Sequence, residues 1–260
     1  MSRILRPIAA LVRLSLIELW RRNDIFGLLV LALALIVPLG AATPFGAEGA
    51  SRYLDEAALL LIWAFSLFIA LGTGSRLFPP EFEHRTIYPL LSKPVSRGVL
   101  LVGKYLGAVT ASVSALAFFY LLFALSVGLR GGGWFAPDLL QAFALHAAFV
   151  AVAVALALLG SLLLTPSANL TLCALALTGM FFFGRRLPDY AGNVSAPLAA
   201  AMRVVYAVAP HSEFFDLRQR VVHGWGGVEW TVLLAVAGYA FFYASALLAL
   251  AALALKRKRI

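Results

Sequence analysis

The sequence predicts an all-α, polytopic membrane protein, and its composition and apolar run lengths carry that prediction. Of the 260 residues, 62% are hydrophobic and 13% are charged, whereas soluble domains average about half and about a quarter. Six apolar runs are long enough, or nearly so, to cross a hydrocarbon core of about 30 Å as helices. No long polar insert separates these runs, so residues 1–260 are expected to form a single transmembrane domain.

Residues 1–24 are expected to form an amphipathic helix at the membrane interface. At about 100° per residue, Arg3, Arg6, Arg13 and Arg21 fall within one arc of about 80°, and apolar side chains cover much of the remaining surface. A basic face opposite an apolar face suits a helix that lies among lipid headgroups. A solvated basic leader is the alternative interpretation.

Six transmembrane helices are expected to account for most of the remaining chain. The predicted spans are Ile25–Thr43, Ala57–Ser75, Val99–Leu129, Leu139–Leu164, Ala168–Gly184 and Trp230–Leu255. The fourth and fifth spans are joined through Thr165-Pro166-Ser167, so we expect them to be antiparallel neighbours.

Lysine and arginine are distributed asymmetrically between the segments that join the spans. With both termini inside, 14 of the 21 basic residues lie on the inner side, namely Arg3, Arg6, Arg13, Arg21, Arg22, Arg76, Arg85, Lys93, Arg97, Lys104, Lys256, Arg257, Lys258 and Arg259. The short outer loops contribute only Arg52 and Arg130, and the rest lie in the long segment 185–229, where the positive-inside rule weakens. The sequence therefore predicts a multi-pass protein of the cell membrane with cytoplasmic termini. Anionic lipid headgroups account for the net charge of +9, so no nucleic-acid partner is expected.

The predicted spans lack the paired ionisable side chains that intramembrane catalysis or ion coupling uses. Besides Lys104 at the inner end and Arg130 beyond the outer end, His146 is the ionisable side chain of interest within them. We predict that His146 is a neutral packing residue hydrogen-bonded to a neighbouring helix, and that Lys104 snorkels to the inner surface. No catalytic residue is assigned to this chain.

Two patterns suggest ligand binding, but neither fits the full requirements of a binding site. Gly98 to Lys104 fits the spacing of a phosphate loop, but Tyr105 replaces the Ser or Thr that holds magnesium, and no strand precedes the glycine. Four potential metal ligands lie in the outer segment, namely His211, Glu213, Asp216 and His223. Their spacing fits no compact metal pattern, so no metal site is assigned.

A charged segment, Phe78–Arg97, separates the second and third spans. Consecutive prolines can begin a helix because its first turn has unpaired donors, and Glu81 and Glu83 then lie where the helix dipole favours negative charge. A short helix from Pro80 to Tyr88 is predicted, with Pro89 interrupting it. A solvated loop that ends two spans is the alternative interpretation.

The long segment 185–229 is expected to form an outer loop that caps the exit of the bundle. Its stretch Ala196–Ala209 is apolar apart from Arg203. Non-spanning backbone is tolerated at membrane depth where protein or a cavity covers it. We therefore predict that this stretch dips into the outer leaflet as a re-entrant helix.

Two motifs carry a resemblance to a known family. Between the second and third spans lie Glu81, Glu83, Arg85-Thr86-Ile87, Leu90-Leu91, Pro94-Val95-Ser96-Arg97 and Gly103-Lys104. Ahead of the last span lies Pro210-His211-Ser212-Glu213-Phe214-Phe215-Asp216-Leu217. Over nearly its whole length, the chain resembles the permease subunits of ATP-binding-cassette (ABC) transporters of the type-two family.

The resemblance implies that the charged segment is a coupling helix, which docks on a separate nucleotide-binding subunit. The implied partner-binding residues are Glu81, Glu83, His84, Arg85, Thr86 and Tyr88. ATP and Mg would be bound by that partner subunit, and no cofactor is expected in this chain. Closure of the ATPase dimer would then be converted into tilting of the attached helices.

The resemblance also implies a dimer of permease chains, either identical or closely related, with the first, second and fifth spans near the dimer axis. The expected wall residues of a substrate path are Phe65, Phe68, Thr73, Asn169, Thr171, Thr178 and Phe181. Aromatic and hydroxyl side chains suit an amphipathic or lipid-like cargo, although helix packing explains the same residues equally well.

The sequence thus predicts a permease subunit that exports a substrate, driven by ATP hydrolysis on other chains. Two alternatives stay open. A secondary transporter without an ATPase partner would follow ion gradients, and the lack of buried charge in the predicted spans argues against it. A membrane scaffold or assembly protein would have a fully packed dimer axis and no path.

Overall fold

The computed structural model describes residues 50–83, 96–130 and 136–257, together with isolated positions between residues 9 and 34. The predicted first span, Ile25–Thr43, lies almost entirely outside the described residues, as do most of the predicted interfacial helix and residues 84–95 of the charged segment. These three elements stay predictions.

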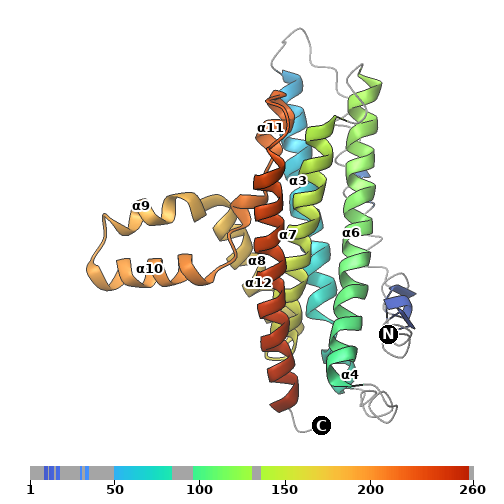
Figure 1. The fold of residues 1–260 in the computed structure, drawn as a ribbon, viewed down its shortest axis with the longest axis vertical. Helices are drawn as coiled ribbons and strands as arrows, with labels where there is room; N and C mark the ends of the chain where they lie inside the picture. The colour runs from blue at the N-terminus through green and yellow to red at the C-terminus, as the bar shows by residue number, and fades with distance from the viewer. Residues whose placement is uncertain are drawn as a thin grey trace.

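Five long apolar helices form the main body of the described chain (Figure 1). They are α3 (Ala50–Ser75), α6 (Arg97–Leu129), α7 (Pro137–Ser161), α8 (Pro166–Phe183) and α12 (Trp230–Arg257), each long and apolar enough to cross a membrane. They coincide with the second to sixth predicted spans. The described residues are helical with no strand, which agrees with the predicted fold class.

Local chemistry explains where several of these helices begin. Pro137 and Pro166 lie in the first turns of α7 and α8, where the missing N–H costs nothing. Ser96 caps α6, and its hydroxyl accepts a hydrogen bond from the Val99 N–H at 3.3 Å. The tight turn before Pro166 makes α7 and α8 neighbours, as predicted.

The helix α3 begins earlier than the sequence predicted, at Ala50 instead of Ala57. The turns before Ala57 carry the charged residues Arg52, Asp55 and Glu56. In the structure, Asp55 forms an ion pair with Arg130 at the end of α6, and Glu56 accepts a hydrogen bond from Gln219. Paired acids can continue a helix beyond its apolar section.

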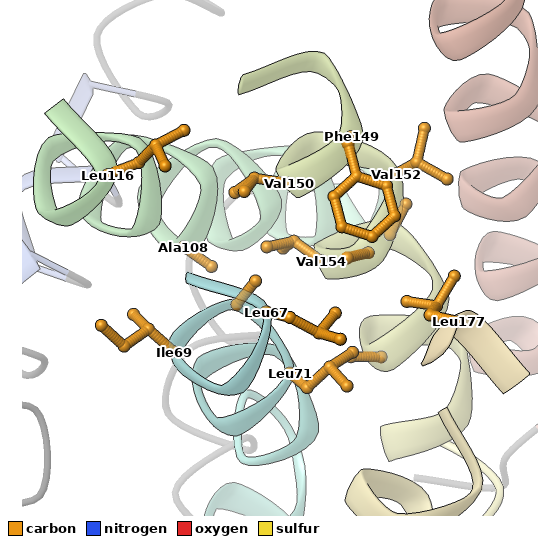
Figure 2. Packing of buried hydrophobic residues seen from close by; sticks show 14 of the residues in the cluster. Leu67, Ile69, Leu71, Ala108, Leu116, Phe149, Val150, Val152, Val154 and Leu177 are labelled. Atoms are coloured by element: carbon orange, nitrogen blue, oxygen red, sulfur yellow. The ribbon is translucent and has the colours of Figure 1, made fainter. Parts of the chain in front are cut away.

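The core of the bundle is centred on α7, which packs against α3, α6, α8 and α12. Figure 2 shows Phe149, Val150 and Val154 of α7 facing Leu67 and Leu71 of α3, and all five side chains are buried. Gly74 allows α3 to approach α7 closely, because a Cβ at that position would lie 2.6 Å from the Cβ of Ala157. Such close backbone approach is the usual basis of helix packing in membranes, where lipid removes the hydrophobic force between helices.

Two short helices leave the bundle sideways at about the middle of its height (Figure 1). They are α9 (Leu187–Ala191) and α10 (Ala196–Val208), and we call residues 187–208 the arm. The helix α10 packs mainly against α9. The stretch predicted to be re-entrant is therefore a helix, while its depth in a membrane stays a prediction.

Short elements join the arm to the long helices. The 3-10 turn η1 (Gly184–Arg186) leads from α8 into the arm, and η2 (Ser212–Phe215) follows it. The helix α11 (Arg218–His223) then packs on α3 and α7 before α12 begins. At the opposite end of the bundle, where α12 ends, lies α4 (Pro79–Glu83) (Figure 1). We refer to the two ends of the bundle as the α4 end and the α11 end.

Candidate functional site

The helix α4 is joined to the bundle by an aromatic anchor. Phe78, which precedes α4, is completely buried, and its ring stacks on that of Phe82 with 6.1 Å between centroids. Phe82 also donates its backbone N–H to the Phe78 carbonyl at 3.2 Å. Movement of α4 must therefore carry Phe78, which lies among the helices of the core.

The residues expected to bind a partner lie on and after α4. Glu81 and Glu83 lie in α4, which the structure describes from Pro79 to Glu83, whereas the sequence predicted a helix from Pro80 to Tyr88. His84, Arg85, Thr86 and Tyr88 lie outside the described residues. The partner-binding role of these six residues stays a prediction.

The prediction that Lys104 snorkels to the surface is wrong. Its side chain is 5% exposed, its Nζ donates a hydrogen bond to the Leu77 carbonyl at 2.8 Å, and it lies 5.3 Å from the centre of the Phe78 ring. A buried ammonium group requires such partners, because removing it from water is costly. Lys104 thus fixes the start of α6 to the segment that carries α4. The sequence could not reveal this contact, because it depends on where the chain leaves α3.

Two further contacts complete the α4 end. The Arg97 guanidinium at the start of α6 donates to the Leu255 carbonyl of α12 at 3.1 Å. Asn169 of α8 is buried and donates to Ser75 Oγ at 3.1 Å and to the Ala157 carbonyl at 2.7 Å. These hydrogen bonds link α6 to α12, and α8 to both α3 and α7.

The structure places the expected wall residues in three environments. Thr73 and Asn169 are buried in helix contacts, and the Thr73 hydroxyl lies 3.2 Å from Ser112 Oγ. Phe68 and Thr171 are exposed on the surface of the chain. The remaining three are partly buried, namely Phe65, Thr178 and Phe181. Their role in a substrate path stays a prediction, and two of the seven already bond neighbouring helices.

His146 lies in a buried polar centre shared by three helices. Its Nε2 is 2.8 Å from Ser66 Oγ of α3, and its Nδ1 is 3.2 Å from the Tyr120 hydroxyl of α6. Both ring nitrogens thus have partners on other helices, which confirms the predicted packing role. Beside it lies a cavity of about 10 Å³, which is bordered by Asp216 and Arg218 and is about the size that one water requires.

The four potential metal ligands of the outer segment are not gathered at one point. Among the described residues, no group of three or more His, Cys, Asp or Glu side chains could hold a metal ion. Asp216 instead pairs with Arg218 at 2.9 Å, and His223 is exposed at the end of α11.

Sequence reasoning missed the environment of Glu213. It assigned this residue to an outer loop, but the carboxylate is buried where the arm joins the bundle, and the His211 ring lies 3.3 Å away. The predicted spans contain no pair of buried ionisable side chains, but the segment 185–229 between the fifth and sixth predicted spans does contain one. The acid two residues after a histidine was visible in the sequence, yet nothing local indicated burial.

These features define a class of protein. Five helices that are long and apolar enough to cross a membrane pack into one bundle centred on α7, and the short helix α4 is anchored at one end of it. This is the organisation of a polytopic membrane protein. The chain belongs to the family of ABC-2 family transporter proteins, whose family model matches residues 41–259. The chain is therefore a membrane-domain protein of the ABC transporter type, as the resemblance to type-two permeases indicated. A comparison with curated proteins found no match.

Proposed function

We propose that the chain is the permease subunit of an ABC exporter and that α4 is its coupling helix. Family membership supports association with ATP-binding subunits, which would bind ATP and Mg. The proposed assembly contains two permease chains and two nucleotide-binding subunits in the cell membrane, with the α4 end facing the cytoplasm. This orientation rests on the positive-inside distribution of Lys and Arg.

The observation that carries the proposal is the buried connection from α4 to the long helices. Phe78 sits in the core beside α4, and Lys104 bonds the carbonyl next to it. Because well-packed interiors do not deform smoothly, a displaced α4 shifts the attached helices as units. A solvated loop between two spans would need neither a buried phenylalanine nor a buried lysine.

The proposed cargo is amphipathic or lipid-like and moves outward. The aromatic and hydroxyl residues of α3 and α8 support this proposal, as does an apolar groove of about 410 Å³ on α12. The groove is lined by Phe214, Val232, Ala235, Val236, Thr231 and Tyr239. These surfaces would solvate an acyl chain and offer few groups to a compact ion.

Charge reversal at α4 tests the coupling assignment. A triple variant, Glu81→Lys, Glu83→Lys and Arg85→Glu, is expected to lose the nucleotide-binding subunit during affinity purification from native membranes, with mass spectrometry identifying the proteins retained. The matched control reverses two exposed charges at the α11 end, Arg220→Glu and Glu229→Lys, and is expected to retain the partner. Equal retention by both variants would contradict the assignment of α4 as the coupling helix.

A further inference from the structure

Glu213 is an unusual residue for its position. It is 5% exposed, and within the part of the chain that the structure describes neither carboxylate oxygen has a hydrogen-bond partner. The group that faces it is the His211 ring, whose Nδ1 lies 3.3 Å from Oε1. An isolated buried carboxylate is strongly unfavourable, so this side chain needs either a counter-charge or a proton.

The pair lies where both ends of the arm meet the bundle. A Cβ at Gly184 would lie 2.7 Å from Glu213 Oε2, so the backbone entering the arm runs directly against the carboxylate. The chain leaving the arm contributes Tyr206, whose ring is 4.5 Å from the His211 ring between centroids. On the bundle side, the Tyr239 hydroxyl of α12 accepts the His211 backbone N–H at 3.1 Å.

We propose that Glu213 and His211 form a proton-binding site at the base of the arm and hold one proton between them. With that proton present, the pair is either an imidazolium beside a carboxylate or an imidazole beside a carboxylic acid, and the total charge is zero in both. Removing the proton leaves a buried carboxylate without a counter-charge. Adding a second proton leaves a cationic ring without one.

The other ionisable groups around the pair do not replace His211. Arg185 of η1 donates to the Glu213 backbone carbonyl at 3.5 Å and not to its carboxylate. Asp216 and Arg218 neutralise each other. The other ring side chains that the structure places against His211 include two tyrosines, Tyr206 of α10 and Tyr239 of α12, which offer hydroxyl groups and no counter-charge.

The arm depends on this site because it has few other attachments. Ala199 is the buried residue among the 13 residues of α10, and Tyr243 donates a hydrogen bond to the Val208 carbonyl near the end of that helix. Water must enter to solvate Glu213 once the proton leaves, and the backbone at Gly184 stands in its way. Proton loss therefore loosens the arm at its base.

Hydrogen exchange of the purified chain in lipid nanodiscs tests the site. In the wild type, the protection factors of residues 187–208, corrected for the intrinsic pH dependence of exchange, are expected to be highest at an intermediate pH and to fall about tenfold as the pH rises to 9. Glu213→Gln is expected to abolish the fall at high pH, since no carboxylate remains to be exposed. His211→Asn is expected to move the fall to lower pH, since Glu213 must then keep the proton alone.

The matched control is His223→Asn, because His223 is exposed on α11, a helix whose main contacts are with α3 and α7. It is expected to reproduce the wild-type profile. The same pH profile in the wild type, Glu213→Gln and His211→Asn would overturn the proposal, as would a profile abolished by His223→Asn. Thermal unfolding of each variant at one intermediate pH identifies any variant that fails to fold. Glu213→Gln and His211→Asn are each compared with the wild type, so one folded variant is enough to test the site. The experiment needs neither a partner subunit nor transport, so its outcome is separate from that of the proposed coupling helix.

Discussion

The α7-centred bundle and the arm are both apolar in sequence, yet they use their apolar side chains in opposite ways. In α7, Phe149, Val150 and Val154 are completely buried against neighbouring helices. In α10, Leu198, Val204 and Val208 are about half to two-thirds exposed. Burial of apolar side chains in the bundle therefore provides most of the folding stability of the described chain. The arm buries few side chains of α10, so its position depends on the contacts at its base.

The same contrast extends to polar groups. In the bundle, His146 has a hydrogen-bond partner for each ring nitrogen, namely the hydroxyls of Ser66 and Tyr120. At the base of the arm, the described residues give Glu213 one ion-pair partner, His211. Fully satisfied polar networks make packing rigid, whereas a buried carboxylate without hydrogen-bond donors depends on a counter-charge or a proton.

The largest effect is expected from emptying the core. Phe149→Ala should lower the free energy of unfolding by about 3 to 5 kcal/mol, because a completely buried ring is removed from among packed helices. Phe241→Ala on α12 is the matched control, since its ring is 68% exposed and its loss should cost about 0.5 kcal/mol or less. Reversible unfolding in mixed micelles measures both. Equal losses would show that burial in the α7 core does not set the stability of the bundle.

A smaller effect is expected where α7 and α8 approach. A Cβ at Gly160 would lie 1.9 Å from Asn169 Oδ1, so Gly160→Ala must displace the amide that bonds Ser75 and Ala157. Overpacking of this kind costs about 1 to 3 kcal/mol. Gly179→Ala on α8 meets nothing within 4 Å and should leave stability nearly unchanged in the same assay. If Gly160→Ala left the free energy of unfolding unchanged, the contact between Gly160 and Asn169 would be able to relax.

The smallest change in stability is expected at Lys104, where the main expected effect is on the coupling of ATP hydrolysis to transport. Lys104→Met removes the donor to the Leu77 carbonyl and should cost about 1 to 2 kcal/mol. If α4 transmits force, the variant should still bind its ATPase partner but transport less per ATP hydrolysed in proteoliposomes. Lys256→Met, at an exposed position on α12, is the control. Unchanged coupling in Lys104→Met would limit this lysine to a structural role.

Some of the fold follows from the sequence because its causes are local. Long apolar runs identified five helices that the structure confirms, and Pro137 and Pro166 marked two of their starts. The role of His146 also followed, since a lone polar ring in an apolar helix requires a partner. The start of α3 did not follow, because Asp55 is tolerated there through Arg130, which is 75 positions away in the chain.

The sequence by itself determined the membrane class, the five described spans and the family, because each depends on composition, run length or a contiguous motif. Only the tertiary structure decided that Lys104 points inward to the Leu77 carbonyl between α3 and α4, and that Glu213 is enclosed with His211 at the base of the arm. Burial of a charge is a property of its neighbours. Those neighbours come from helices far apart in the chain, so no local pattern records them.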